Sequence, residues 1–204
     1  DHGMGVMLIM RGPGGFTGGK TIDGMVSQID IFPTACEMLD IQPPAWLQGT
    51  SLLPLARGET FDSRGWALSM YSGVTSNTIS YMLRQGDYKL IAYEGYPTRL
   101  FNLANDPDEL QDLANVEPDR VTEMEELLAS VVNREETLRL WTDYRRHTFA
   151  QFQRQAKRGL YWDSSYSLRG NPSSDYKELM NNAFTGWDDA DEARVNRWLE
   201  GEDS

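Results

Sequence analysis

The chain has 204 residues, of which 40% are hydrophobic and 11% aromatic, and this composition is typical of a folded globular protein rather than a disordered one. Its 31 acidic and 19 basic side chains give a net charge of −12, which argues against a nucleic-acid-binding protein because such proteins present a basic face. The single cysteine excludes a disulfide framework and a thiolate zinc cluster, and no apolar run is long enough to span a bilayer.

The amino-terminal part of the chain predicts one strand and one helix. Residues 6–10 are all apolar and end at a Gly/Pro cluster, as in a strand buried on both faces of a parallel sheet. Apolar side chains at helical spacing predict a helix over residues 30–40, with Pro33 in its first turn. A loop follows through residues 46–55, and the polar segment 58–65 is interpreted as a junction between subdomains.

The middle of the chain changes to short strands and the remainder to helices. Turn residues separate four predicted strands at 67–71, 78–84, 89–93 and 99–103, a spacing typical of an antiparallel meander. Helical periodicity then covers residues 119–133, 134–158 and 188–199.

Charge is distributed unevenly along these elements. Residues 102–126 hold nine acidic and one basic side chain, and residues 134–158 hold seven basic and three acidic ones. The pattern fits either solvated helix faces or a basic face that docks on an acidic surface.

Few residues suggest chemistry by themselves. Cys36 sits among apolar residues and is expected to be a packed core thiol, and His147 has no neighbouring ligand. The glycine-rich loop 12–19 lacks the ending of a phosphate-binding loop. Asp1 and His2 together are compatible with a divalent-cation site or with a simple turn, and the residues alone leave both readings open.

Several phrases, in order, resemble the sulfatases of the alkaline-phosphatase superfamily. They cover residues 6–14, 26–34, 44, 48–55, 84–91 and 100–114, the last reading Leu-Phe-Asn-Leu-Ala-Asn-Asp-Pro-Asp-Glu-Leu-Gln-Asp-Leu-Ala. The covered stretch resembles the carboxyl-terminal third of such an enzyme. The resemblance implies an α+β fragment of an α/β sulfatase: the end of the main parallel-sheet domain, then a small four-stranded antiparallel sheet packed with a helix, then a helical tail.

The resemblance also bears on the catalytic groups. The opening residues resemble the family phrase Tyr-Asp-x-Gly-x-Arg-Val-Pro that follows the catalytic lysine, so Asp1 and His2 are not expected to bind calcium. Sulfatases form their formylglycine nucleophile in a Cys/Ser-x-Pro/Ala-x-Arg segment, and Cys36 is followed by Glu-Met-Leu-Asp instead. Nucleophile, Ca²⁺ ligands and catalytic lysine are therefore expected upstream, in a parent enzyme that uses Ca²⁺ and formylglycine, and the fragment is expected to be inactive alone.

Three regions follow from this interpretation. Residues 1–60 would end the main domain, residues 66–133 would form the antiparallel subdomain, and residues 134–204 would form an aromatic-rich tail. Loop positions make four residues candidates for the rim of a substrate pocket: His2, Tyr71, Ser72 and Asn77. Residue types that anchor interfaces make six tail residues candidates for contacts with a second subunit or with the missing domain: Trp141, Tyr144, Arg145, Arg146, Tyr161 and Trp162.

The sequence is also compatible with functions other than that of a sulfatase. The chain also fits a non-catalytic assembly module that forms a homo-oligomer through its tail, or the carboxyl-terminal part of a phosphonate monoester hydrolase or phosphodiesterase. The expected partner is an amino-terminal sulfatase domain, without nucleic acid or a membrane span. A periplasmic, secreted or cytoplasmic location is equally compatible with the sequence.

Overall fold

A computed structural model of the chain describes residues 5–12, 19, 21–61, 63–72, 78–157, 176, 177, 180 and 186–202. The chain divides into two compact units, residues 1–132 and 133–204, and each is described by itself.

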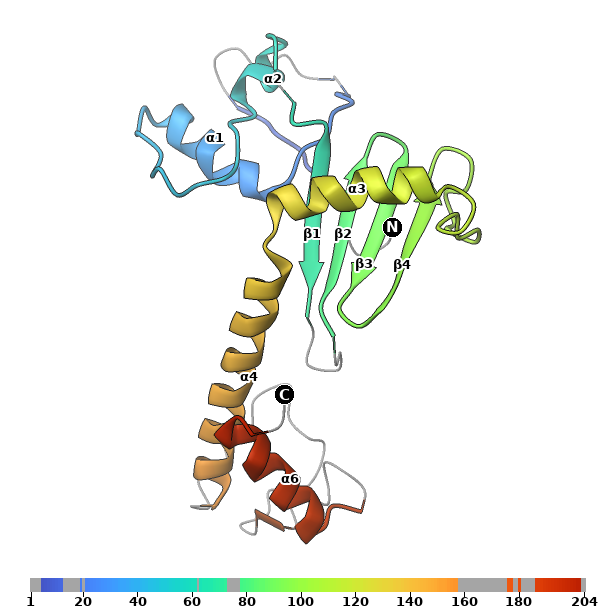
Figure 1. The fold of residues 1–204 in the computed structure, drawn as a ribbon. Coiled ribbons are helices and arrows are strands. Elements are labelled where there is room, and N and C mark those ends of the chain that lie inside the picture. The colour runs from blue at the N-terminus through green and yellow to red at the C-terminus, as the bar shows by residue number, and fades with distance from the viewer. Residues whose placement is uncertain are drawn as a thin grey trace. The chain divides into compact units, whose positions relative to one another are not determined.

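The centre of the first unit is a four-stranded antiparallel sheet (Figure 1). Its strands are β1 (Trp66–Tyr71), β2 (Ser80–Gln85), β3 (Tyr88–Tyr93) and β4 (Tyr96–Asn102), and they lie in the order β1-β2-β3-β4. This confirms the predicted meander. The turns that join β2 to β3 and β3 to β4 are short because glycine supplies the left-handed backbone they need, with φ 56° at Gly86 and 79° at Gly95.

One face of the sheet forms the main core with helix α3 (Pro118–Val131). Figure 1 shows this helix crossing the strands. Leu83, Leu90 and Leu100 lie opposite one another on β2, β3 and β4 and are fully buried, as are Met124 and Leu128 of the helix. Each such side chain contributes about 1.5–3 kcal/mol when it is buried. The helix predicted over residues 119–133 is confirmed.

A second group of elements precedes the sheet. It comprises the 3-10 turn η1 (Gln28–Asp30), helix α1 (Ile31–Met38) and the short helix α2 (Leu53–Arg57), which packs on α1. The helix predicted over residues 30–40 is confirmed, although it ends two residues earlier. Helix α2 was predicted as loop, because five residues are too few to show a helical period.

The strand predicted over residues 6–10 is wrong. This segment has no regular secondary structure, and Met7 and Ile9 are 85% and 77% exposed. A strand needs a neighbour for its backbone hydrogen bonds, and no described segment pairs with residues 6–10. The apolar run therefore remains at the surface.

The second unit contains helices α4 (Arg134–Lys157) and α6 (Asp189–Glu200), which pack against each other. Both confirm predicted helices. Asp188 caps α6 by accepting hydrogen bonds from the N–H groups of Ala190 and Asp191 at 2.8 and 2.9 Å. Phe149 of α4 contacts Phe152 and Trp198, with ring centroids 5.8 and 6.3 Å away. No helix in the described part of the chain has the length and apolar character needed to cross a membrane.

Candidate functional site

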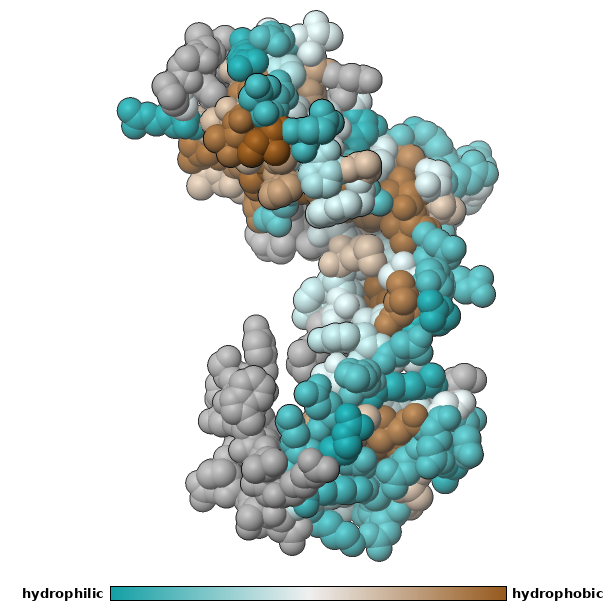
Figure 2. All heavy atoms as spheres, turned by 90° about the vertical axis from the view of Figure 1, so that its left-hand side faces the viewer, coloured by the Kyte–Doolittle hydropathy of each residue, from teal (hydrophilic) through white to brown (hydrophobic). Residues whose placement is uncertain are grey.

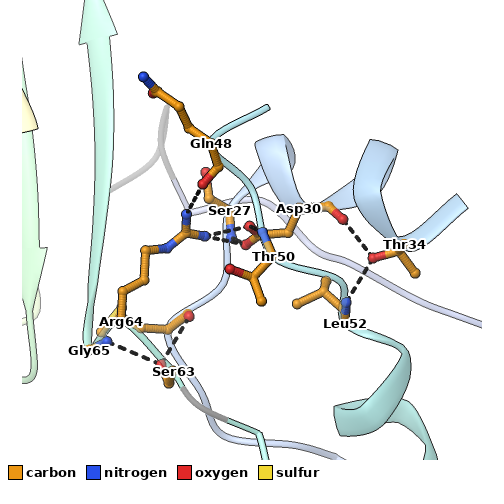
Figure 3. Close-up of polar contacts among 10 residues, drawn as sticks. Ser27, Asp30, Thr34, Gln48, Thr50, Leu52, Ser63, Arg64 and Gly65 are labelled. Carbon is orange, nitrogen blue, oxygen red and sulfur yellow. Dashed lines mark hydrogen bonds and ion pairs between the residues drawn. The ribbon is translucent and has the colours of Figure 1, made fainter. Parts of the chain in front are cut away.

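A polar cluster of the first unit surrounds the carboxylate of Asp30 (Figure 3). This side chain is fully buried at the junction of η1 and α1. Its two oxygens accept hydrogen bonds from the backbone N–H groups of Ser27 and Thr50, both at 2.8 Å. The guanidinium of Arg64 donates to both oxygens at 2.5 Å and forms an ion pair with them. Asp30 thus joins three segments that are distant in the sequence.

Thr34 extends the cluster by one helical turn. Its hydroxyl donates to the Asp30 carbonyl at 2.6 Å and accepts from the Leu52 N–H at 2.8 Å. Because Leu52 immediately precedes α2, this threonine connects the first turn of α1 with the start of the next helix. The four-residue spacing of Asp30 and Thr34 is what places both groups on one side of α1.

Gly49 allows the loop of residues 48–50 to reach this cluster. A Cβ atom at position 49 would lie 2.1 Å from the backbone oxygen of Ile29, which no side chain can tolerate. The glycine therefore lets the Thr50 N–H approach the Asp30 carboxylate. This close approach explains the glycine in the phrase at residues 48–55.

The surroundings of Arg64 complete the charge pair. One nitrogen of its guanidinium lies 3.5 Å from the Gln48 carbonyl, and the group lies 5.5 Å from the centre of the Trp66 ring. Asp30 accepts four hydrogen bonds from three donor nitrogens, and the cation of Arg64 lies against its charge. We therefore assign the pair to holding the structure together rather than to acid–base chemistry.

A hollow lies beside this cluster, with a volume of about 580 Å³. Its lining includes Pro33, Glu37, Asp40 and Ser51, with two carboxylates and no basic side chain. An anionic ester would meet repulsion there, because nothing in the lining offsets its charge. The hollow is therefore a poor site for a sulfate or phosphate ester.

Lys89 and Glu109 form a second ion pair that the sequence did not reveal. The Lys89 ammonium is 3% exposed and donates to the two Glu109 carboxylate oxygens at 2.8 and 2.7 Å. Burial raises the pKa of Glu109, the hydrogen bond and the positive charge of Lys89 lower it, and the net shift places that pKa below its ordinary value. The pair fastens the segment after β4 to the sheet, across 20 residues of sequence.

The predicted rim residues are only partly described. Tyr71 and Ser72 lie at the end of β1 and are exposed, Tyr71 to 57%, and the Tyr71 carbonyl accepts from the Ser80 hydroxyl at 3.3 Å. His2 and Asn77 lie outside the described residues. The role of these four residues at a pocket stays a prediction.

Four predicted interface residues lie on α4. Tyr144 is 68% exposed, the Arg145 guanidinium lies 4.6 Å from the Trp141 ring centre, and that of Arg146 lies 5.7 Å from the ring of Trp198. The remaining two, Tyr161 and Trp162, fall outside the described residues. Part of this aromatic set thus pairs with arginines within the second unit.

The structure also locates Cys36 and His147. Cys36 is buried, with 6% exposure, as predicted for a core thiol, and His147 is exposed on α4. Within the described residues, His, Cys, Asp and Glu side chains do not gather in any group of three or more that would hold a metal ion.

Comparison with known proteins gives the class of this molecule. Residues 1–137 match the family model described as N-sulphoglucosamine sulphohydrolase, C-terminal. Arylsulfatase K of Danio rerio is 36% identical over 135 residues, which are 63% of this chain and 26% of that protein, and the Homo sapiens protein of the same name is 37% identical over 139 residues. The chain therefore spans about a quarter of the length of the curated relatives it matches.

Solved structures agree on the fold. A protein of Bacteroides thetaiotaomicron assigned as a sulfatase superposes with a TM-score of 0.53 at 26% identity, over 78% of this chain and 34% of that one. Phosphonate monoester hydrolase SpPMH of Silicibacter pomeroyi, with a TM-score of 0.54 at 20% identity over 61% of this chain and 28% of that one, shares the fold alone.

The four-stranded sheet with its crossing helix thus defines a carboxyl-terminal sulfatase subdomain of the α+β type. The chain belongs to the N-sulphoglucosamine sulphohydrolase C-terminal family.

Proposed function

We propose that this chain is the carboxyl-terminal part of a sulfuric ester hydrolase, and that it supports an amino-terminal catalytic region rather than hydrolysing esters by itself. The observation that carries the proposal is an exposed apolar surface on the elements that precede the sheet. The family match and the greater length of the relatives agree with it.

That surface, here called the α1 face, is formed by α1 and the loop behind it. Figure 2 shows apolar side chains gathered in this region. Its large members are about half exposed or more: Ile31, Phe32, Met38, Leu39, Ile41 and Trp46. A contiguous apolar patch of this kind on a folded protein marks an interaction surface.

The occupant we infer for the α1 face is the catalytic region of a sulfatase. Relatives of this chain are about four times longer than the part they share with it. The opposite side of α1 is already fixed by the Asp30 cluster, so the apolar side is presented in a defined orientation. Ordering the face before it docks lowers the entropic cost of association.

The chemistry would come from the partner region. The resemblance to sulfatases implies that formylglycine, Ca²⁺ and a lysine stabilise the transfer of the sulfuryl group there. In this chain, Asp30, Thr34 and Arg64 would orient the docking helix through the hydrogen bonds and the ion pair that they form. No proton transfer is assigned to them.

Reconstitution tests this proposal. An arylsulfatase K relative truncated before the matched segment would be co-expressed with this chain and assayed with 4-nitrophenyl sulfate and, separately, with a phenylphosphonate monoester. We expect complex formation and turnover of the sulfate ester, and no turnover by the chain alone. A complex that fails to form, or that forms without turnover of the sulfate ester, would contradict the proposal.

A matched pair of variants identifies the docking surface. Phe32→Asp places a charge on the α1 face and is expected to weaken the complex about 100-fold, because a desolvated charge costs several kcal/mol. Tyr96→Asp, at an equally exposed aromatic residue on β4, is expected to leave it unchanged. Equal binding by both variants, or hydrolysis of aryl sulfate by the chain alone, would contradict the proposal.

A further inference from the structure

The two edges of the sheet are unequal. Natural sheets protect their edge strands with charges, proline, bulges or covering segments, because an unprotected edge pairs with other chains. The β4 edge has such protection: it carries Pro97 and Arg99, and the N–H and C=O of Leu100 bond to Asp112 and to the Leu113 N–H at 3.1 and 2.8 Å. This edge is therefore closed to a further strand.

Strand β1 itself has none of the charges, prolines or bulges that protect an edge. Its sequence, Trp-Ala-Leu-Ser-Met-Tyr, contains neither proline nor a charged residue, whereas β2, β3 and β4 each carry a basic one. Its pairing with β2 is regular over all six residues, without a bulge. In the described part of the chain, β1 has a strand partner on one side only.

The direction of the backbone groups on β1 follows from the β2–β3 turn. In a two-residue hairpin the closing pair, here Gln85 and Tyr88, is hydrogen-bonded. The backbone N–H and C=O groups of successive residues point to opposite sides of a strand. Because Gln85 bonds to β3, the even-numbered residues of β2 bond to β1. Ser69, which lies opposite Met82, therefore directs its backbone groups toward β2. The N–H and C=O groups of Leu68 and Met70 therefore point away from the sheet.

The apolar core is also incomplete at this edge. Leu68 and Met70 lie opposite Leu83 and Tyr81, on the face that α3 covers. Leu83 and Tyr81 are fully buried, but Leu68 is only half-buried and Met70 is 46% exposed. Helix α3 packs on β2 and β3, so the apolar side chains that extend this layer onto β1 are not covered by the helix.

We propose that β1 pairs antiparallel with β1 of a second copy of this chain, which makes one continuous eight-stranded sheet. Antiparallel pairing of a strand with its own copy is two-fold symmetric, so each copy offers the same outward groups of Leu68 and Met70. Directly opposed residues in such a pair share a face, so the half-covered apolar side chains of both copies would meet.

The distribution of charge makes β1 a more favourable contact site for a second copy than the charged parts of the surface. Two chains of net charge −12 repel each other, so their contact is least costly where neither carries a charge, and β1 is such a segment. Because the β4 edge is closed, the assembly would stop at a dimer instead of growing into a fibre. The pairing does not depend on the proposed enzymatic role.

Sedimentation velocity and amide exchange test the proposal on the full chain. We expect a dimer at ~100 μM protein, and exchange protection of the Leu68 and Met70 amides that rises with protein concentration. The inward-bonding Ser69 amide should be protected at all concentrations. A monomer at this concentration, or unprotected Leu68 and Met70 amides in a dimer, would overturn the pairing.

Variants separate this edge from the tail. Met70→Pro removes an outward N–H and leaves the β1–β2 ladder intact, and Met70→Lys places like charges near the two-fold axis; each should weaken the dimer at least about tenfold. Tyr144→Lys on α4 and Tyr96→Lys on β4 are the matched controls and should leave the dimer unchanged, with circular dichroism verifying each fold. A dimer that Tyr144→Lys dissociates and Met70→Lys does not would assign the contact to the tail and overturn the proposal.

Discussion

At the residue scale, the Asp30–Arg64 pair shows how one buried side chain restricts the residues at several positions of a short sequence motif. One carboxylate holds the start of α1, the loop at residues 48–50 and the segment that enters β1. A buried charge of this kind depends on all its partners, because each lost donor leaves part of the charge uncompensated. The geometry therefore restricts residues at several separate positions at once.

Arg64→Ala tests this dependence. Removing the cation leaves Asp30 buried with its two backbone donors only, and we expect the free energy of unfolding to fall by about 3 kcal/mol. Urea denaturation followed by circular dichroism measures the change. Arg57→Ala, at an exposed arginine on α2, is the control and should change stability by less than about 0.5 kcal/mol. Similar losses in both variants would show that the ion pair is not what holds these segments.

At the scale of elements, α3 and the sheet form the part of the molecule whose packing is most complete. Met124 and Leu128 are spaced one turn apart and meet a row of leucines drawn from three strands. The helix thereby adds side-chain packing on β2 and β3 to the backbone hydrogen bonds that join these strands. The apolar side of α3 and the alternating inward side chains of the strands form one common core.

Leu128→Ala should reveal the contribution of this layer. Truncation of a fully buried leucine leaves a cavity, and we expect a loss of about 2–5 kcal/mol in unfolding free energy with an unchanged denaturant m-value. Glu126→Ala, two residues away on the exposed side of α3, is the matched control. A loss below about 1 kcal/mol for Leu128→Ala would contradict the assigned core.

At the scale of the whole molecule, proton binding links the Lys89–Glu109 pair to global stability. The folded-state pKa of Glu109 lies below its ordinary value of 4.5, so the folded state binds this proton less readily than the unfolded chain. The stabilisation from the pair is therefore present above pH 4.5 and is lost as the pH falls through the folded-state pKa.

Glu109→Gln removes this titration while keeping the shape of the side chain. We expect the variant to be less stable than the parent chain near neutral pH, and the difference to shrink below about pH 4.5. Chemical denaturation at a series of pH values measures both curves. A difference that is constant down to acid pH would show that ionisation of Glu109 does not stabilise the fold.

Some features of this protein follow from local sequence patterns, and others follow from contacts between distant segments. The sequence by itself determined the four strands, the helices α1, α3, α4 and α6, and the family, because hydrophobic period, turn residues and local phrases are properties of short segments. Tertiary structure alone decided the rest. The apolar run at residues 6–10 is no strand, because strand formation depends on a neighbour and not on apolar character. Likewise, the pairing of Asp30 with Arg64, the union of Lys89 with Glu109 and the difference between the two sheet edges arise from contacts between distant segments, which no local pattern encodes.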